Sequence, residues 1–459
     1  MWRRTLFKNQ CIPLVIESIS SDGNGVGHFE GQAVFVPFSA VGDVLRVKAV
    51  KVCKNYAFGI IEEIVSPGAG HIQSDCPIFG KCGGCALRHL TYEAELEAKQ
   101  GFVEDAMRRI GGLRLPVQPI LPAPHADRYR NKVQYPLFRA PDGSVRAGFY
   151  ASRSHRPVPC ADCHLQPALL NQIARTVCAL LTKYHIPVYD EQTHSGLVRH
   201  VYLRHAVTTG RVMVCLVCNG QRLPHAGAVC DALRKAHPEI ETIVLNVNTR
   251  RTNVITGEKN IALYGSGVLC DAVSGVPVAL GPLSFYQVNT KGAEQLYAVA
   301  AQFAALEKED TLLDLYCGAG TIGLSMMKQT NCARLVGVEI VPEAVESARR
   351  SAEEMGVENA EFLCADAGEA AQKLAAQGLS PDVIVLDPPR KGCDVATIDA
   401  VCTMAPRRVV MVSCNPATAA RDAAALEGKE YEAKRIQPVD MFPRTRHVET
   451  VILLQRETS

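Results

Sequence analysis

A lone cysteine follows a run of β-branched and apolar residues near the C-terminal end of the chain. Cys414 stands in the stretch VSCNPAT, directly before Asn and Pro. A thiolate is a strong nucleophile, so a cysteine at the end of a predicted strand could begin covalent chemistry. Glu449, in FPRTRHVET, and the nearby His447 are groups that could move a proton. Taken without its context, the cysteine fits a buried thiol with no chemical role equally well.

A glycine-rich segment, DLYCGAGTIG, lies between a predicted strand and a predicted helix. The spacing Gly318-x-Gly320-x-x-Gly323 is found in dinucleotide-binding sites. Glu339 follows 21 residues after Gly318, at the end of the next predicted strand, where it could hold ribose hydroxyl groups. Asp314, at the mouth of the loop, would repel a pyrophosphate and would suit an ammonium or a sulfonium group.

Two further carboxylates follow later strands, Asp366 in CADAGEA and Asp387 in VIVLDPPR. Carboxylates at successive strand ends fit S-adenosylmethionine, which carries positive charge and no phosphate. We therefore favour a methyltransferase over an NAD-dependent dehydrogenase. A helix N-cap is the plainer interpretation of each carboxylate, and it suits Asp366 better than Asp387, which precedes two prolines.

The cysteine and the cofactor loop together predict methylation of an unactivated carbon. Transfer of a methyl group to oxygen or nitrogen needs no nucleophile as strong as a thiolate. Carbon 5 of uracil needs one, because addition of a thiolate at carbon 6 turns the ring into an enolate that attacks the methyl group. Cys414 would be this nucleophile, and Glu449 the base that removes the proton from carbon 5 before the thiolate leaves.

Eighteen cysteines are many for a chain expected in a reducing compartment, where thiols stay unpaired. Three lie in CPIFGKCGGC and two in PCADCHLQ: Cys76, Cys82, Cys85, Cys160 and Cys163. Their spacing allows a zinc site made of the last four. It also allows a four-iron four-sulfur cluster on the first three and one later cysteine. A thiol cluster without metal is the third interpretation.

Three regions are expected to position these residues. Residues 1–66 contain short β-branched runs between Gly, Asp and Asn turns, a pattern typical of a small OB-like barrel. Residues 67–290 are mixed α+β and carry the cysteine segments. Residues 291–459 alternate between helix and strand patterns, which predicts βαβ units and a parallel sheet. The predicted fold class is multidomain α/β: an N-terminal barrel, a central mixed domain and a C-terminal Rossmann-like methyltransferase domain.

The stretch 125–160 carries seven Lys and Arg residues against two Asp. In RYRNKVQYPLFR, Arg130 and Lys132 stand among Tyr129 and Tyr135. Basic residues beside aromatic ones suit contact with phosphates and stacking on unpaired bases. An ordinary solvated strand face is the plainer interpretation, and a net charge of +2 does not decide between them.

The composition, 47% hydrophobic and 21% charged, is ordinary for a globular protein that buries real cores. No stretch approaches the ~18 uninterrupted apolar residues of a membrane span. The N-terminal MWRRTLFKNQCIPLV is basic but contains no signal-peptide core. We expect a cytoplasmic protein with no membrane association and no obligate protein partner.

Five motifs occur in the order seen in the RNA 5-methyluridine (uracil-carbon-5) methyltransferases: SFYQVN, DLYCGAGTIGL, LDPPRKG, VSCNPAT and FPRTRHVET. The N-terminal region resembles that family's TRAM domain, so the resemblance covers nearly the whole chain. It implies that Cys414 is the nucleophile, that Glu449 is the base, and that Phe285 lines the uracil pocket. It also implies six residues that bind S-adenosylmethionine or shape its pocket: Gln287, Tyr316, Thr321, Glu339, Asp366 and Asp387.

The barrel and the cysteine segments make the chain most similar to the bacterial 23S ribosomal RNA enzymes of that family. Those enzymes carry a four-iron four-sulfur cluster whose last ligand lies in a Cys-Pro-Leu-Gln-like stretch. CHLQ matches this stretch best, so the resemblance implies the ligands Cys76, Cys82, Cys85 and Cys163, with Cys160 as the alternative to the last. The family's YRNK stretch favours Arg130 and Lys132 as RNA contacts.

We therefore expect methylation of a uridine in 23S ribosomal RNA. The same chemistry on transfer RNA, by enzymes that share this layout, is the first alternative. An RNA-binding ribosome-assembly factor with vestigial catalysis is the second.

Overall fold

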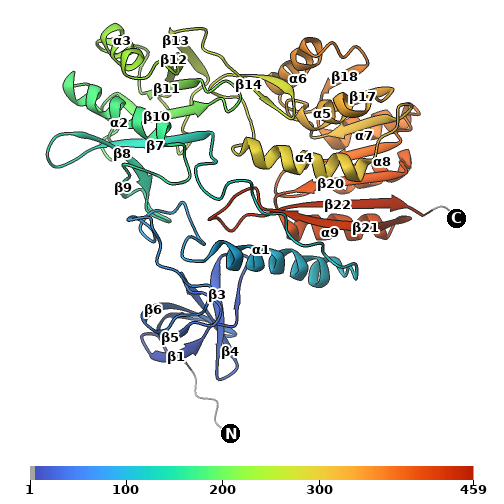
Figure 1. Ribbon diagram of the computed structural model, residues 1–459, viewed down its shortest axis with the longest axis horizontal. Helices are drawn as coiled ribbons and strands as arrows, with labels where there is room; N and C mark the ends of the chain where they lie inside the picture. Colours follow the sequence, from blue (N-terminus) through green and yellow to red (C-terminus); the bar gives the residue numbers. More distant parts are fainter. Residues whose placement is uncertain (1–5, 458–459) are drawn as a thin grey trace.

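The computed structural model describes residues 6–457, and its C-terminal part is an α/β domain around a seven-stranded sheet (Figure 1). The strand order is β18-β17-β16-β19-β20-β22-β21. The strands are β16 (Thr311–Leu315), β17 (Arg334–Glu339), β18 (Ala360–Cys364), β19 (Val383–Leu386), β20 (Arg408–Ser413), β21 (Tyr431–Val439) and β22 (Glu449–Arg456). The first five are parallel, and β22 pairs antiparallel with both β20 and β21.

Helices cover both faces of this sheet, as the continuous apolar runs of its parallel strands require. One face carries α4 (Thr290–Ala304), α5 (Thr321–Thr330) and α6 (Pro342–Glu354). The other carries α7 (Ala367–Ala376), α8 (Val395–Met404) and α9 (Pro416–Glu427). From β16 the sheet grows one way through β17 and the other way through β19. Ligands of such sheets bind where this order reverses, outside the carboxyl ends of the strands.

The central region has its own seven-stranded sheet, in the order β13-β12-β11-β10-β7-β8-β9. Its strands are β7 (Lys132–Arg139), β8 (Val145–Tyr150), β9 (Pro157–Pro159), β10 (Val198–His205), β11 (Val212–Cys218), β12 (Ile240–Val247) and β13 (Lys259–Tyr264). One face packs on α2 (Ala168–Lys183) and α3 (Ala226–Ala236). The other shares a core with α4 and the hairpin of β14 (Leu269–Val273) and β15 (Val276–Leu280). This shared core joins the central region to the C-terminal domain.

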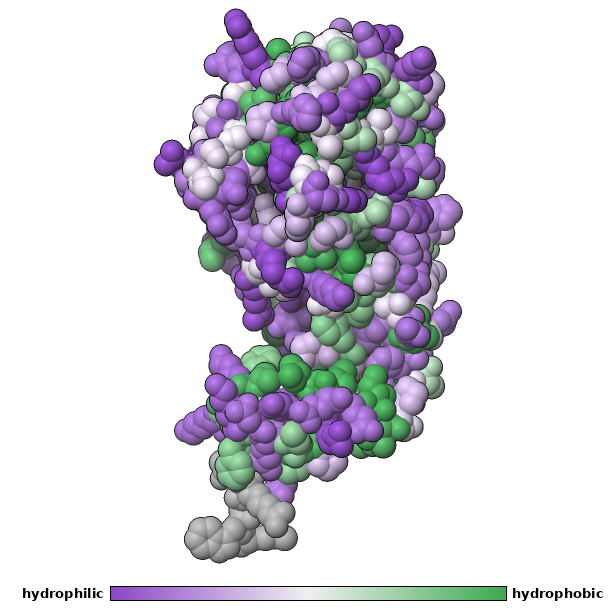
Figure 2. Space-filling model, turned by 90° about the vertical axis from the view of Figure 1, so that its left-hand side faces the viewer, coloured by the Kyte–Doolittle hydropathy of each residue, from purple (hydrophilic) through white to green (hydrophobic). Residues whose placement is uncertain are grey.

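The N-terminal region is a six-stranded sheet in the order β1-β5-β6-β4-β3-β2. Its strands are β1 (Cys11–Val15), β2 (Ser18–Ile19), β3 (Asn24–Phe29), β4 (Gln32–Pro37), β5 (Val44–Val52) and β6 (Tyr56–Ser66). Buried and exposed residues alternate along β1 and β5, so one side of each strand fills a small core. Figure 2 shows this region set off from the rest by a narrower waist, with hydrophobic side chains on the face in view.

The helical stretch after the first cysteine segment forms α1 (Tyr92–Ala106), which runs into the π-helical turn η1 (Met107–Gly111). Both pack against α9 and so belong to the core of the C-terminal sheet. The chain after η1 is extended and lies beside the end of β21, where the backbone of Leu121 forms hydrogen bonds with Pro438 and Asp440.

The predicted fold class is confirmed, while the domain boundaries at 66/67 and 290/291 stay predictions. Within residues 6–457, no helix is long and apolar enough to cross a membrane.

Candidate active site

One large cleft, of about 1590 Å³, extends from the barrel across the central region to the carboxyl edge of the C-terminal sheet. It is lined by eleven of the residues that the sequence predicted for catalysis, cofactor binding and substrate binding. These are Cys414, Glu449, Gln287, Tyr316, Thr321, Glu339, Asp366, Asp387, Phe285, Arg130 and Lys132. The barrel contributes Phe38, Lys51 and Phe58. The structure thus gathers residues from all three regions around one space, while the role of each residue stays a prediction.

Cys414 is the first residue after β20, and Asn415 behind it caps helix α9. The Asn415 side chain accepts a hydrogen bond from the N–H of Ala417 (3.2 Å) and donates one to the carbonyl of Arg390 (3.1 Å). Pro416 occupies the first turn of the helix, where its missing N–H leaves no bond unmade. The stretch SCNPAT therefore ends a strand, begins a helix and leaves a half-buried thiol at the cleft.

Glu449 opens β22, which lies next to β20, so its carboxyl group lines the cleft with the Cys414 thiol. Burial raises the pKa of Cys414, the charge of Glu449 raises it further, and the Arg390 guanidinium lowers it. Burial raises the pKa of Glu449 to about 8; Asp387 adds to this shift and Arg390 opposes it. In the free protein at neutral pH, the thiol and Glu449 therefore both hold their protons.

His447 also lines the cleft, but it is a poor candidate for the base. Burial lowers its pKa to about 4, and Arg390 and Arg446 contribute to the decrease. A neutral imidazole with this pKa binds a proton far more weakly than the Glu449 carboxylate does. The electrostatics of the cleft thus favour Glu449 over His447 as a proton acceptor.

The loop between β16 and α5 has the backbone geometry of a tight turn, with positive φ at Tyr316 (65°), Gly318 (55°) and Gly320 (71°). The Tyr316 hydroxyl contacts Thr397 Oγ1 at 3.2 Å. Glu339, the last residue of β17, accepts a hydrogen bond from the N–H of Gly318 (3.0 Å). This bond ties the glycine loop to the next strand and leaves both at the edge of the cleft.

Asp314 lies below the loop rather than at its mouth. It is 1% exposed near the end of β16, and its Oδ2 accepts a hydrogen bond from the N–H of Gly323 (3.0 Å) in the first turn of α5. Burial raises the pKa of Asp314 to about 7. The prediction that Asp314 meets the cofactor is therefore wrong, because the side chain points under the positive end of the helix, where a carboxyl group stabilises the turn.

Asp366 and Asp387 follow β18 and β19 as predicted. Asp366 caps α7 by accepting a hydrogen bond from the N–H of Gly368 (2.9 Å), so the N-cap interpretation holds, although the side chain also reaches the cleft. Asp387 caps no helix, and burial raises its pKa to about 7. Thr321, at the start of α5, shares a hydrogen bond with the buried Tyr297 hydroxyl (2.9 Å). Three strand ends thus present polar groups to one side of the cleft.

The cleft is also lined by the residues expected to meet a substrate. Phe285 lies between β15 and α4 and is 71% exposed. Lys132 opens β7, and burial, Arg204 and Arg130 together lower its pKa to about 8. Within residues 6–457, the Lys132 ammonium group has neither a hydrogen bond nor an ion pair. It faces the cleft with no anion beside it, which suits a phosphate-bearing substrate.

The two tyrosines of the basic stretch cannot stack on bases. Tyr129 is 7% exposed and its hydroxyl donates to a backbone carbonyl, while Tyr135 is 1% exposed and donates to Asn171 (2.6 Å). Arg128 is held by Asp162 at 2.7 Å. The predicted stacking role is therefore wrong for both tyrosines, because these rings and hydroxyls pack inside the central region.

A family model described as tRNA (Uracil-5-)-methyltransferase matches residues 281–457, and a TRAM domain model matches residues 6–61. The chain is 42% identical to an uncharacterized RNA methyltransferase of Halalkalibacterium halodurans, over 98% of this chain and 97% of that protein. It is 40% identical to one of Oceanobacillus iheyensis, over 98% of each. The chain belongs to the RNA (uracil-5-)methyltransferase family.

Among solved structures, this methyltransferase resembles the tRNA (uracil-54, C5)-methyltransferase of Pyrococcus abyssi in complex with S-adenosyl-L-homocysteine. The TM-score is 0.77 at 26% identity, and the match covers 96% of this chain and 100% of that one. The similarity spans the barrel, the central region and the C-terminal sheet. The protein is accordingly an enzyme that methylates RNA with S-adenosylmethionine, and the carboxylate-lined end of its cleft fits that positively charged molecule.

A second, smaller cavity of the methyltransferase, of about 70 Å³, brings the two cysteine segments together. It is lined by Cys76, Cys82, Cys85, Cys160 and Cys163, and otherwise mainly by apolar residues. Burial raises the pKa of Cys82, and it raises that of Cys85 to about 12. A hydrogen bond from Cys160 lowers the pKa of Cys163 to about 7, and the N–H groups of residues 165 and 166 assist. The two cysteine segments thus place five thiols around one small cavity.

Within residues 6–457, no group of three or more His, Cys, Asp or Glu side chains is arranged to hold a metal ion. In a mononuclear zinc site, four thiolates converge on one atom at about 2.3 Å. A four-iron cluster differs, because each thiolate binds a different corner of a cube and the sulfur atoms stand further apart. Five cysteines around one mostly apolar cavity fit this arrangement, and a cluster there stays a prediction.

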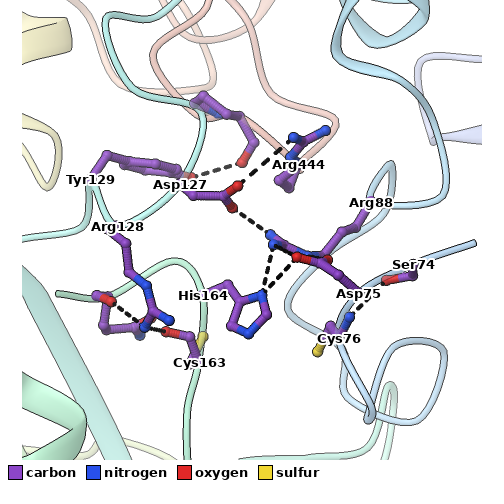
Figure 3. A network of polar contacts seen from close by, with 12 residues as sticks. Ser74, Asp75, Cys76, Arg88, Asp127, Arg128, Tyr129, Cys163, His164 and Arg444 are labelled. Carbon is purple, nitrogen blue, oxygen red and sulfur yellow. Dashed lines mark hydrogen bonds and ion pairs between the residues drawn. The ribbon is translucent and has the colours of Figure 1, made fainter. Parts of the chain in front are cut away.

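Polar contacts join the cysteine segments to the segment that precedes Glu449 (Figure 3). Arg88 is the centre: its guanidinium binds Asp75 at 2.6 and 2.9 Å and Asp127 at 2.7 Å. Asp75 also contacts His164 Nδ1 (3.0 Å), and Asp127 faces Arg444 at 3.9 Å. Hydrogen bonding to Arg88 lowers the pKa of Asp75 to about 2. Because Asp75 and His164 adjoin cysteines of the cavity, the network connects the cavity to the catalytic cleft.

Sequence reasoning missed two residues of the site. Arg390 lines the cleft beside Cys414, and its place in the quoted motif LDPPRKG was the signal that could have found it. Lys99 is completely buried on α1 and contacts the segment before Glu449, and no local pattern marks it.

Proposed function

We propose that this enzyme methylates carbon 5 of a uridine in RNA through a covalent adduct between Cys414 and carbon 6 of the base. The observation that carries the proposal is the common cleft. A cysteine and a buried carboxyl group, with an arginine beside them, face the same space as the carboxylates that suit S-adenosylmethionine. A methyltransferase acting on oxygen or nitrogen would have no use for that cysteine.

Cys414, Glu449 and Arg390 each have a separate role in the proposed reaction. The Cys414 thiol first gives up its proton to solvent. The thiolate then adds to carbon 6, and the electrons of the C5=C6 bond move toward carbon 5 and the adjoining carbonyl. S-adenosylmethionine, when bound, supplies the electrophilic methyl group for carbon 5. Glu449 then takes the remaining proton from carbon 5, the C5=C6 bond forms again, and the thiolate leaves carbon 6. Arg390 stabilises the thiolate, since it lowers the pKa of Cys414.

The raised pKa of Glu449, about 8, has a consequence for the last step. A base must be deprotonated to act, so proton abstraction should accelerate as pH rises toward 8 and level off above it. A carboxylate with a raised pKa is also a stronger base once it is charged, which suits removal of a proton from carbon.

We propose 23S ribosomal RNA as the substrate, on the resemblance of the barrel and the cysteine segments to the enzymes of that branch. Transfer RNA is the second candidate. It is favoured by the similarity over both full lengths to the Pyrococcus abyssi enzyme, which acts on uracil 54 of transfer RNA.

In either RNA, the target uracil must leave its stack to reach a thiol inside a cleft. Phe285 would pack against the base, and Arg130 and Lys132 would bind adjacent phosphates. Lys51 and Phe58 of the barrel lie further along the same cleft and extend the path for a single strand.

We further propose a four-iron four-sulfur cluster in the smaller cavity, held by Cys76, Cys82, Cys85 and Cys163. Cys163 is favoured over Cys160 because CHLQ matches best the Cys-Pro-Leu-Gln-like stretch that carries the last ligand in the resembled enzymes. Methyl transfer moves no net electrons, so the cluster would join two chain segments rather than transfer electrons.

The test uses 23S ribosomal RNA and transfer RNA, each transcribed with uridine tritiated at carbon 5. Tritium released into water, with S-adenosylmethionine present, reports substitution at carbon 5. We expect release from the ribosomal transcript, and none from it with Cys414→Ala. Release from transfer RNA alone would make transfer RNA the substrate in place of ribosomal RNA and would leave the proposed chemistry unchanged. Release by Cys414→Ala would overturn the covalent mechanism, and none from either RNA would favour the assembly-factor alternative.

A further inference from the structure

The segment 440–448 carries much of the catalytic side of the cleft, yet it is neither helix nor strand. It connects β21 to β22 and contributes Phe442, Arg446 and His447 to the cleft wall before the chain reaches Glu449. The ladder between β21 and β22 begins where Val439 pairs with Glu449. An irregular segment between two paired strands has no backbone ladder of its own, so contacts with other parts of the chain must determine its conformation.

A buried group of charges on α1 supplies these contacts. The Lys99 ammonium donates three hydrogen bonds: to Glu95 Oε1 (2.7 Å), to Asp440 Oδ1 (2.8 Å) and to the carbonyl of Phe442 (3.1 Å). The side chains of Lys99, Glu95 and Asp440 are all completely buried. An ammonium group has three protons, and all three here are bonded, so the group has one stable orientation.

The same carboxylates bind the backbone of the segment. Glu95 Oε1 accepts a hydrogen bond from the N–H of Arg444 (2.6 Å), and Asp440 Oδ1 accepts one from the N–H of Phe442 (3.2 Å). Asp440 Oδ2 accepts a further bond from the Tyr92 hydroxyl (2.8 Å). The group on α1 therefore holds the segment at residues 440, 442 and 444.

The far side of Arg444 is held as well. Its carbonyl accepts hydrogen bonds from the N–H groups of Ala86 (3.0 Å) and Leu87 (3.1 Å), directly after Cys85. Residues 440, 442 and 444 are thus each bonded from outside the segment. The chain between Arg444 and Glu449 is therefore fixed at one end by these bonds and at the other end by β22.

Buried ion pairs contribute little net stability, because taking charges out of water costs about as much as their attraction returns. The best-supported benefit of such groups is that they select one conformation over others. In this protein the selected conformation is that of a loop that ends at the proposed base. We propose that Lys99, with Glu95 and Asp440, is a positioning group that sets the geometry of segment 440–448 and thereby the approach of Glu449 to carbon 5 of the target uridine.

This inference rests on the proposed function, since it assigns the group to the step that Glu449 performs. If Glu449 is displaced, addition of Cys414 and methyl transfer can still proceed, while removal of the proton from carbon 5 is slowed. The covalent adduct should then accumulate, and binding of RNA and S-adenosylmethionine should change little. Loss of a group that only stabilised the fold would lower the amount of folded enzyme, and the adduct would not accumulate.

The experiment compares Lys99→Met with two matched variants. Glu95→Gln keeps an oxygen that can accept from both Lys99 and Arg444, so it is the conservative variant. Leu233→Ala empties a buried position on α3, in the central region, and lowers stability without touching the segment. Each variant is assayed with the transcript from which the wild type releases tritium, and the adduct is followed on denaturing gels.

Lys99→Met should lower the turnover number at least about tenfold, lower KM for RNA with it so that kcat/KM stays within about twofold, and accumulate the adduct. Glu95→Gln and Leu233→Ala should stay within about threefold of the wild type. Normal turnover in Lys99→Met, or an equal loss with adduct in Leu233→Ala, would overturn the inference. If Lys99→Met does not fold, Tyr92→Phe removes one hydrogen bond to Asp440 and should cause a smaller change in the same direction.

Backbone hydrogen exchange separates this inference from the proposed function, because it needs no substrate. The amides of Phe442 and Arg444 should exchange faster in Lys99→Met than in the wild type, and Leu233→Ala should leave them unchanged. Unchanged exchange in Lys99→Met would overturn the positioning role even if the uridine chemistry holds. A wild type that releases no tritium would overturn the uridine chemistry, while the exchange result would still decide whether the group holds the segment.

Discussion

The methyltransferase contains two kinds of thiol site, and their surroundings differ. Cys414 faces two carboxyl groups and a guanidinium group, from Glu449, Asp387 and Arg390. The five cysteines of the smaller cavity face one another and a mostly apolar wall, with Arg130 shared between this cavity and the main cleft. Both sites are partly buried, and burial raises the pKa of most of these thiols.

Under the proposed function, this difference is what separates a reactive thiol from a structural one. Cys414 has partners that can take its proton or stabilise its charge, and it opens onto a space large enough for a nucleotide. The five cysteines have mainly other thiols as partners and enclose about 70 Å³, so their sulfur atoms can meet an inorganic group but no base. Neither burial nor the raised pKa distinguishes the two sites; the identity of the neighbours does.

The largest effect should come from removing the thiol of the main cleft. Cys414→Ala should lower methylation by roughly 10⁴-fold or more, because the whole covalent route is lost. S-adenosylmethionine should still bind, since the carboxylates of the cofactor site are untouched. The turnover number and the affinity for S-adenosylmethionine, both measured on this variant, check these two expectations. Cys402→Ala, a half-buried thiol on α8, should behave as the wild type, and measurable methylation by the Cys414 variant would remove the distinction between the sites.

Cys82→Ala, in the cysteine cavity, should lower the rate of methylation less than Cys414→Ala does, but it should clearly change the iron content of the protein. The variant should lose iron after anaerobic purification and unfold at a lower temperature, because the two cysteine segments are no longer joined. Iron per protein chain and the thermal midpoint measure this. Cys215→Ala, in the core strand β11, should keep its iron. Full iron in Cys82→Ala, or zinc in the wild type, would contradict the cluster assignment.

The smallest effect should be opposite shifts in the pKa of Cys414. Arg390→Met removes a cation that lowers this pKa, and should raise it. Glu449→Gln removes a charge that raises it, and should lower it. The pH dependence of alkylation by iodoacetamide reports both shifts, once the alkylation of the other cysteines, measured in matched variants that carry Cys414→Ala, is subtracted. Shifts of the same sign in both variants would show that the neighbours act through structure rather than charge.

Local patterns were enough to predict much of the site. The strand end before Cys414, the glycine loop and the carboxylates after β18 and β19 depend on residues close together in the chain. Parallel strands bring such ends to one edge of a sheet, so the common cleft of Cys414, Glu339 and Asp387 followed from topology alone.

The failures share a cause. Asp314 was expected to meet the cofactor and instead supports α5 from below, and Tyr129 and Tyr135 were expected on the surface and are buried. The direction of a side chain at a strand end or in a short strand depends on what packs above and below it, which the local pattern does not contain. Arg390 and Lys99 were missed because their importance lies in contacts made across the fold.

The sequence by itself determined the order of the three regions, the family, and the residue types that can perform the chemistry, because these follow from periodicity and from short motifs. Only the tertiary structure decided which thiols share a cavity, which aspartate lies under a helix, and that Lys99 reaches Asp440, 341 positions further along the chain. Those contacts depend on how separate segments pack together, and packing is a property of the whole chain rather than of any stretch within it.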